Sequence, residues 1–271
     1  MVSITLFNLG TALYAIAAYL YLADWLAGFR QARRWIRWAL FGVVLLHAGA
    51  VIGRSIEYGF PFLTLREVLS IYAWALALLC LILELRFGYT IIGVLVTPFG
   101  VSLILFATFL PAAQQPLLAM LQSPWLMAHV GVFFSAYAAF TMAFAAALAY
   151  LLQERALRKK QLSLRLPPLL VMDALCRWLV TVGILLMSAA MITGSIWAER
   201  VWNTPWVWEP KQVLCLITLG IYGLYYFVRH VARWSARRAS WLVAIGFVSV
   251  LTTFIGADLL ASNALHTFLF P

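Results

Sequence analysis

The amino-acid sequence predicts an all-α membrane protein that crosses the bilayer about eight times. Of its 271 residues, 65% are hydrophobic and only 10% are charged, whereas soluble domains average about 25% charged residues. The mean hydropathy is +0.96, and apolar runs long enough for a spanning helix recur along the whole chain. A transmembrane β-barrel would show short segments of alternating polarity, and the sequence has none.

Glycine, proline and charged residues divide the apolar runs into eight predicted spans. The first run begins at Ile4 without a basic segment before it or a small-residue cleavage site after it, so we expect it to be a retained helix. No linker is long enough to separate domains, and we therefore expect one transmembrane domain over residues 1–271. The predicted spans are 4–28, 38–58, 66–86, 90–110, 124–152, 172–197, 209–229 and 240–260.

The basic residues predict the orientation of these spans. All but four of the 19 Lys and Arg residues follow the odd-numbered spans or lie at the start of the even-numbered ones, on one side of the membrane. By the positive-inside rule this side is cytoplasmic, which places both termini outside. The net charge of +10 then reports membrane orientation, and no nucleic-acid partner is expected. We expect a multi-pass protein of the bacterial inner (cytoplasmic) membrane.

The segment from about 197 to 211, called the tryptophan segment below, joins the sixth and seventh spans on the predicted outer side. It is rich in tryptophan, and Pro205 and Pro210 predict an irregular backbone. Two histidines of other spans, His129 and His266, are predicted at the same membrane level. The basic residues of the predicted outer side are Arg54, Arg66, Arg200 and Lys211. The tryptophans and the glutamate of the segment are Trp197, Trp202, Trp206, Trp208 and Glu209.

This combination of residues fits haem. Haem takes axial imidazoles on its iron, flat apolar surface against the macrocycle, and cations near its two propionates. Each residue also has a simpler interpretation, because tryptophans anchor membrane interfaces and isolated histidines near helix ends are commonly hydrogen-bonding groups. Arg66 and Glu67 could form an ordinary helix-end ion pair. His47 lies in the middle of the second span, where ionisable groups are costly, and is a further candidate for haem binding.

The stretch GSIWAERVWNTPWVWEPKQVLCLITLGIYGLYYFVR resembles the tryptophan-rich signature of the cytochrome c assembly proteins of the CcsA/ResC/CcmC group, which also includes HemX-like proteins. His129 in WLMAHV and His266 in LHT occupy the positions of the two outer histidines of that family. The matching residues of the signature are Gly194, Trp197, Ala198, Trp202, Trp206, Trp208, Pro210, Lys211, Leu216, Ile217, Thr218, Tyr225 and Arg229.

The resemblance implies a protein that holds non-covalent haem b at the outer face, with His129 and His266 as ligands of the haem iron. Delivery of haem to apocytochrome c, as one component of a cytochrome c synthase and with a CcsB/ResB-like partner, is the implied role. Four positions depart from the family pattern. Asn203 replaces a glycine, Glu209 an aspartate and Gln212 an acidic residue, and Phe227 stands where many synthase members carry an intramembrane histidine.

Two other functions remain open from the sequence. One is a HemX-like membrane regulator of haem biosynthesis, for which glutamyl-tRNA reductase would be the partner. The other is a transporter of an unrelated small solute, which would require polar residues along a path through the spans.

Overall fold

The computed structural model describes residues 2–28, 31–58, 64–88, 90–111, 123–160 and 166–256, and within these ranges it contains eight α-helices and no strand. Seven of these helices are long and apolar enough to cross a membrane. The all-α, multi-pass prediction is therefore confirmed. The helices are α1 (Val2–Ala27), α2 (Ala32–Tyr58), α3 (Leu65–Phe87), α4 (Thr90–Phe109), α5 (Pro124–Arg158), α6 (Leu169–Trp202), α7 (Pro210–His230) and α8 (Ala236–Leu251), followed by the short π-helix η2 (Thr252–Gly256).

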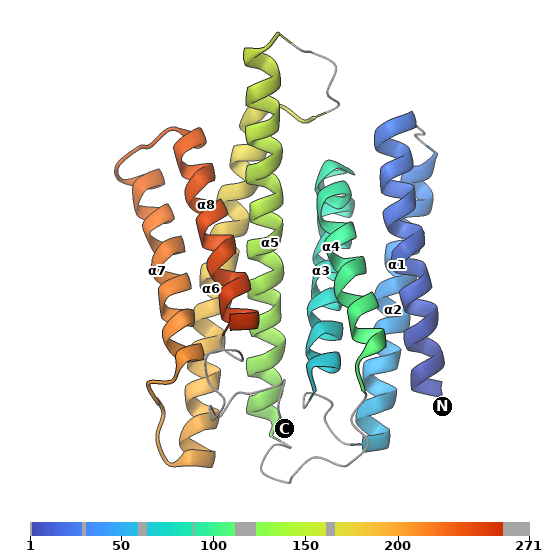
Figure 1. Ribbon diagram of the computed structural model, residues 1–271, viewed down its shortest axis with the longest axis vertical. Helices are drawn as coiled ribbons and strands as arrows, with labels where there is room; N and C mark the ends of the chain where they lie inside the picture. The colour runs from blue at the N-terminus through green and yellow to red at the C-terminus, as the bar shows by residue number, and fades with distance from the viewer. Residues whose placement is uncertain are drawn as a thin grey trace. The chain divides into compact units, whose positions relative to one another are not determined.

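The chain divides into two compact units, Met1–Ser123 with α1–α4 and Pro124–Pro271 with α5–α8. Consecutive helices within each unit run antiparallel (Figure 1). The expectation of one domain over residues 1–271 stays a prediction.

In the first unit, the buried residues of α1 follow one another at alternating spacings of four and three, so they form one face of the helix. This face carries several polar groups, and each of them has a partner on α2 or α3: Ser3 Oγ donates to Glu57, Tyr14 pairs with His47, Tyr21 with Cys80, and Asp24 with Arg33. The remaining face of α1 is exposed and mostly apolar, as expected of a helix that faces lipid. The buried residues are Ser3, Phe7, Gly10, Tyr14, Ala17, Tyr21 and Asp24.

In the second unit, α5 and α6 form a long antiparallel pair. At about 1.5 Å per residue, α5 reaches roughly 50 Å, well beyond the ~30 Å hydrocarbon core. It runs to Arg158, past the predicted end at residue 152, because residues 153–158 are good helix formers and Glu154 pairs with Arg158 one turn on. The buried face of α5 is rich in alanine, which allows close approach of α6.

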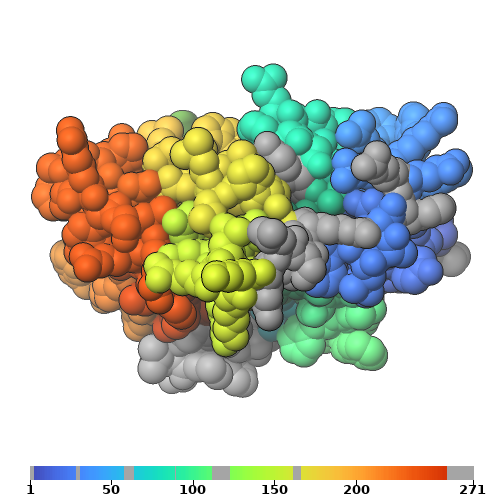
Figure 2. All heavy atoms as spheres, turned by 90° about the horizontal axis from the view of Figure 1, so that it is seen from above, coloured from blue at the N-terminus to red at the C-terminus, as the bar shows by residue number. Residues whose placement is uncertain are grey.

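The basic ends of these helices gather at one end of the second unit. Asp173 at the start of α6 accepts from Arg229 at the end of α7, with a 2.6 Å contact, and from Arg177 at 3.0 Å. Figure 2 looks onto this end, where the end of α5, the start of α6 and the α7–α8 connection lie side by side. His129 and the tryptophan segment therefore lie at the opposite end of the same unit (Figure 1).

Candidate functional site: a histidine and tryptophan cluster at one end of α5 to α7

His129 lies in the second turn of α5 and faces α6. Its Nδ1 is 2.7 Å from the carbonyl oxygen of Ala190. A carbonyl oxygen only accepts, so Nδ1 carries the proton, and in the neutral imidazole the lone pair is on Nε2. Histidines that ligate metals commonly donate their other N–H to a backbone carbonyl in this way, which fixes both the tautomer and the ring orientation.

Gly194, one turn after Ala190, makes room for this imidazole against α6. A Cβ at position 194 would lie 2.6 Å from His129 Nδ1 and 2.7 Å from Cε1, closer than carbon can approach. Phe133 lies one turn further along α5, with its ring centroid 5.7 Å from that of His129. The sequence signature contains Gly194, but this role depends on which residue of α5 faces it.

The tryptophan segment is partly helical, which corrects the expectation of a loop over about 197–211. α6 continues to Trp202, because residues 195–202 contain neither glycine nor proline and include the helix formers Ala198, Glu199 and Arg200. Trp197 is buried on this helix, and its ring makes an edge contact with that of Trp202 at 5.0 Å. The irregular part is limited to residues 203–209.

Two departures from the family pattern have a structural explanation in this irregular part. Asn203 ends α6 in the left-handed conformation, with φ of +56°, which asparagine tolerates better than other non-glycine residues. Gln212 Oε1 accepts the backbone N–H of Val207 at 3.0 Å, so an amide oxygen serves where the family has an acidic one. The turn is closed by Thr204 Oγ1, which donates to the carbonyl of Trp206, and α7 begins at Pro210.

The four tryptophans differ in exposure. Trp206 and Trp208 meet edge to face at 5.7 Å, and Trp208 is 77% exposed. By contrast, the indole Nε1 atoms of Trp197 and Trp206 are buried and have no hydrogen-bond partner among the described residues. A buried donor without a partner is costly, so these two N–H groups favour a ligand that brings oxygen acceptors. Glu209, three residues after Trp206, is buried at the N-cap of α7.

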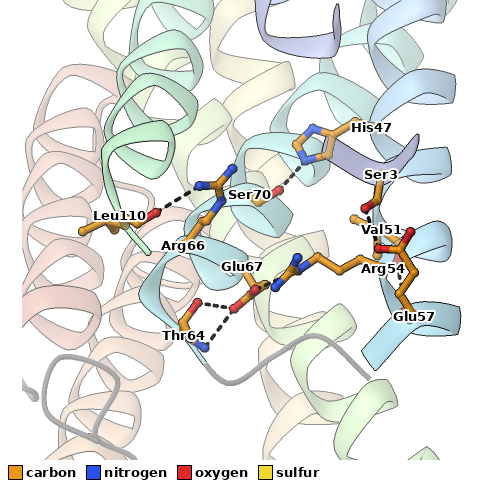
Figure 3. A network of polar contacts seen from close by, with 11 residues as sticks. Ser3, His47, Val51, Arg54, Glu57, Thr64, Arg66, Glu67, Ser70 and Leu110 are labelled. Atoms are coloured by element: carbon orange, nitrogen blue, oxygen red, sulfur yellow. Dashed lines mark hydrogen bonds and ion pairs between the residues drawn. The ribbon is translucent and has the colours of Figure 1, made fainter. Parts of the chain in front are cut away.

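The four cations that the sequence predicts on the outer side are divided between the two units. In the second unit, Arg200 lies over the ring of Trp125 at 5.3 Å, and Lys211 is the second residue of α7. In the first unit, Arg54 Nε donates to Glu67 Oε1 at 3.0 Å (Figure 3). Arg66 Nη1 donates to the carbonyl of Leu110, also at 3.0 Å. The ion pair of Glu67 is therefore with Arg54 and not with its sequence neighbour Arg66.

His47 is fully packed inside the first unit, 2% exposed, and both its ring nitrogens have partners. Nδ1 lies 3.2 Å from the hydroxyl of Tyr14, and Nε2 contacts the hydroxyl of Ser70. Phe7 and Tyr14 contact the ring edge-on. These contacts favour a structural histidine that joins α1, α2 and α3. Phe227, at the position of the family's intramembrane histidine, is 53% exposed on α7.

The structure thus brings together His129, Gly194, Trp197 and the irregular segment 203–209. These residues fit haem. The oriented imidazole suits the iron and the aromatic rings suit the macrocycle, while the two buried indole N–H groups and Arg200 suit the propionates. His266 lies outside the described residues, so its pairing with His129 stays a prediction.

Comparison with known proteins identifies the family of this chain. A sequence profile described as cytochrome C assembly protein matches residues 62–265. The chain is 31% identical to the cytochrome c biogenesis protein CcsA of Parasynechococcus marenigrum (strain WH8102), over 91% of this chain and 90% of that protein. It is also 31% identical to CcsA of Guillardia theta, over 79% of each chain.

The fold also matches a solved structure, the cytochrome c heme lyase CcmF, with a TM-score of 0.69 and 15% sequence identity. The match covers 94% of this chain and 47% of CcmF, so the chain spans about half the length of that protein. Since the profile covers most of the chain and the two CcsA relatives align over 91% and 79% of it, this chain is a member of the cytochrome c assembly protein family and a multi-pass membrane protein of cytochrome c biogenesis.

Proposed function

We propose that this protein holds haem b non-covalently at the outer membrane face, with His129 and His266 as axial ligands, for delivery to apocytochrome c. The observation that carries the proposal is the hydrogen bond from His129 Nδ1 to the Ala190 carbonyl. It orients the imidazole and leaves Nε2 with the lone pair that a metal requires. The family membership supplies the biological context for this ligand.

The other residues of the cluster have distinct roles in this proposal. The rings of Trp206 and Trp208 supply apolar surface for the macrocycle. The buried indole N–H groups of Trp197 and Trp206 donate to oxygen atoms of the ligand. Arg200 and Lys211 are the cations that would pair with the haem propionates. Haem supplies the reacting group for thioether formation, while the protein contributes binding, orientation and exclusion of water.

A partner completes the proposed function. We infer a CcsB/ResB-like membrane protein that delivers apocytochrome c to the haem. The relatives reported above are named for cytochrome c biogenesis, which favours this role over regulation of haem biosynthesis. Co-purification separates the two: capture of a ResB-like protein supports the proposal, whereas capture of glutamyl-tRNA reductase instead contradicts it.

The orientation is part of the proposal, with the site outside the bacterial inner membrane. It rests on the basic residues gathered at the opposite end of the second unit. A cysteine introduced at Asn203 should react with an impermeant thiol reagent in intact cells, and one at Ala236 should not. The reverse labelling pattern would invert the topology.

The direct test is the visible spectrum of the reduced, detergent-purified protein. Two imidazole ligands give the sharp bands of six-coordinate low-spin haem. We expect His129→Ala and His266→Ala each to give a five-coordinate spectrum or to lose haem, and added imidazole to restore the six-coordinate form. His230→Ala, at the far end of α7, is the matched control. An unchanged low-spin spectrum in the double variant would refute the ligand assignment.

A further inference from the structure

A small cavity opens between α1, α2 and α3 of the first unit, and it is called the Arg66 cavity below. Its volume is about 40 Å³, which is room for roughly three water molecules. That space suits the charged end of a ligand rather than a macrocycle. Most of its wall is apolar. The polar lining residues are Ser3, Arg54, Arg66, Glu67 and Ser70, and the apolar ones are Ile4, Phe7, Ala50, Val51 and Ile71.

The carboxylate in this wall is already compensated. Glu67 Oε1 accepts from Arg54 Nε at 3.0 Å, and Oε2 accepts from the backbone N–H of Thr64 at 3.0 Å and from its hydroxyl (Figure 3). The two contacts with Thr64 form a capping box at the start of α3. Arg54 and Glu67 therefore form a hydrogen-bonded ion pair.

Arg66 is the cation of the cavity that forms no ion pair within the described residues. One of its nitrogens donates to the Leu110 carbonyl at 3.0 Å, and the guanidinium lies over the ring of Phe7, 4.7 Å from its centroid. No carboxylate is within ion-pair distance of it in the part of the chain that the structure describes. Arg66 is half-buried at the second position of α3, at the membrane end of an apolar span, which is the level of lipid phosphate groups.

We propose that the Arg66 cavity binds the phosphate of an anionic phospholipid. A guanidinium recognises phosphate oxygens through several charge-assisted hydrogen bonds. The apolar wall favours a lipid over free phosphate, because Ile4 leads from the cavity to the apolar surface of α1, where an acyl chain can lie. Ile4 is itself exposed. This inference concerns the first unit and is independent of haem binding by the second.

The test uses delipidated full-length protein in detergent, titrated with phosphatidylglycerol or phosphatidylcholine and followed by native mass spectrometry. The wild type should retain phosphatidylglycerol preferentially. Arg66→Gln should weaken this binding roughly tenfold or more, since one charged partner is lost, and Arg66→Lys should fall between. Arg158→Gln, which removes an exposed arginine paired with Glu154, is the control and should bind like the wild type.

Three results would overturn the proposal. One is equal retention of the two lipids by the wild type, a result that needs no variant to fold. Another is unchanged phosphatidylglycerol affinity in Arg66→Gln. The third is competition by inorganic phosphate at the same concentration as the lipid, which would identify a free-anion site. The haem spectrum of Arg66→Gln should be that of the wild type. A changed spectrum together with unaltered lipid binding would instead assign Arg66 to the haem site and refute the phospholipid proposal.

Discussion

Replacing Gly194 by alanine tests whether α6 is shaped to hold the His129 imidazole. The added Cβ would meet Nδ1 at 2.6 Å and Cε1 at 2.7 Å, so the ring has to move by about 1 Å to reach van der Waals contact. That movement breaks its 2.7 Å hydrogen bond to the Ala190 carbonyl. Overpacking costs about 1–3 kcal/mol, the lost hydrogen bond about 0.5–1.5 kcal/mol, and the better helix propensity of alanine returns about 0.5–1 kcal/mol.

The expected net loss in the free energy of unfolding is therefore about 1–3 kcal/mol. Unfolding by sodium dodecyl sulfate, followed by circular dichroism, measures it. In a His129→Ala background the imidazole is absent, so Gly194→Ala should become neutral or stabilising. Gly131→Ala is the matched control, because it lies on α5 two residues from His129 and its added Cβ would meet nothing within 4 Å. A cost of Gly194→Ala that is equal with and without His129 would refute the reasoning.

Three further predictions concern residues away from the histidine ring. His47→Ala should lower the free energy of unfolding by about 2–4 kcal/mol, because it empties a packed site and leaves two hydroxyl groups unpaired. The haem spectrum of this variant should stay unchanged. A five-coordinate spectrum would show that His47 is a ligand instead. Asn203→Gly should be tolerated within a few tenths of a kcal/mol, whereas Asn203→Val should cost about 1–2 kcal/mol in the left-handed conformation; equal effects would contradict that conformation. Asp173→Asn should destabilise the second unit by about 1–3 kcal/mol, because the partly exposed guanidinium groups of Arg229 and Arg177 lose a charged hydrogen-bond partner, and thermal unfolding in detergent should detect the loss.

The sequence alone determined the class and the helices of this protein. Long apolar runs between charged segments specify membrane helices because the bilayer core accepts no unpaired backbone, so the signal is local and strong. The ends were less accurate. α5 and α6 extend past the predicted spans 124–152 and 172–197, since helix propensity continues beyond the apolar run that marks the membrane. Pro205 and Pro210 predicted an irregular tryptophan segment, and the irregular part is confined to residues 203–209, between the ends of α6 and α7.

The candidate site divides in a similar way. His129, the tryptophans and Arg200 were found from residue type, predicted side and family signature. The roles of Gly194 and of the Ala190 carbonyl depend on the rotation of α5 against α6, which no single-helix pattern specifies. The same holds for His47, whose mid-membrane position predicted function: only the packing of α1 and α3 against α2 supplies the hydroxyls of Tyr14 and Ser70 to both its nitrogens. Arg66 and Glu67 are neighbours in sequence, yet the tertiary structure pairs Glu67 with Arg54, because α2 brings that guanidinium to the carboxylate and leaves Arg66 over Phe7.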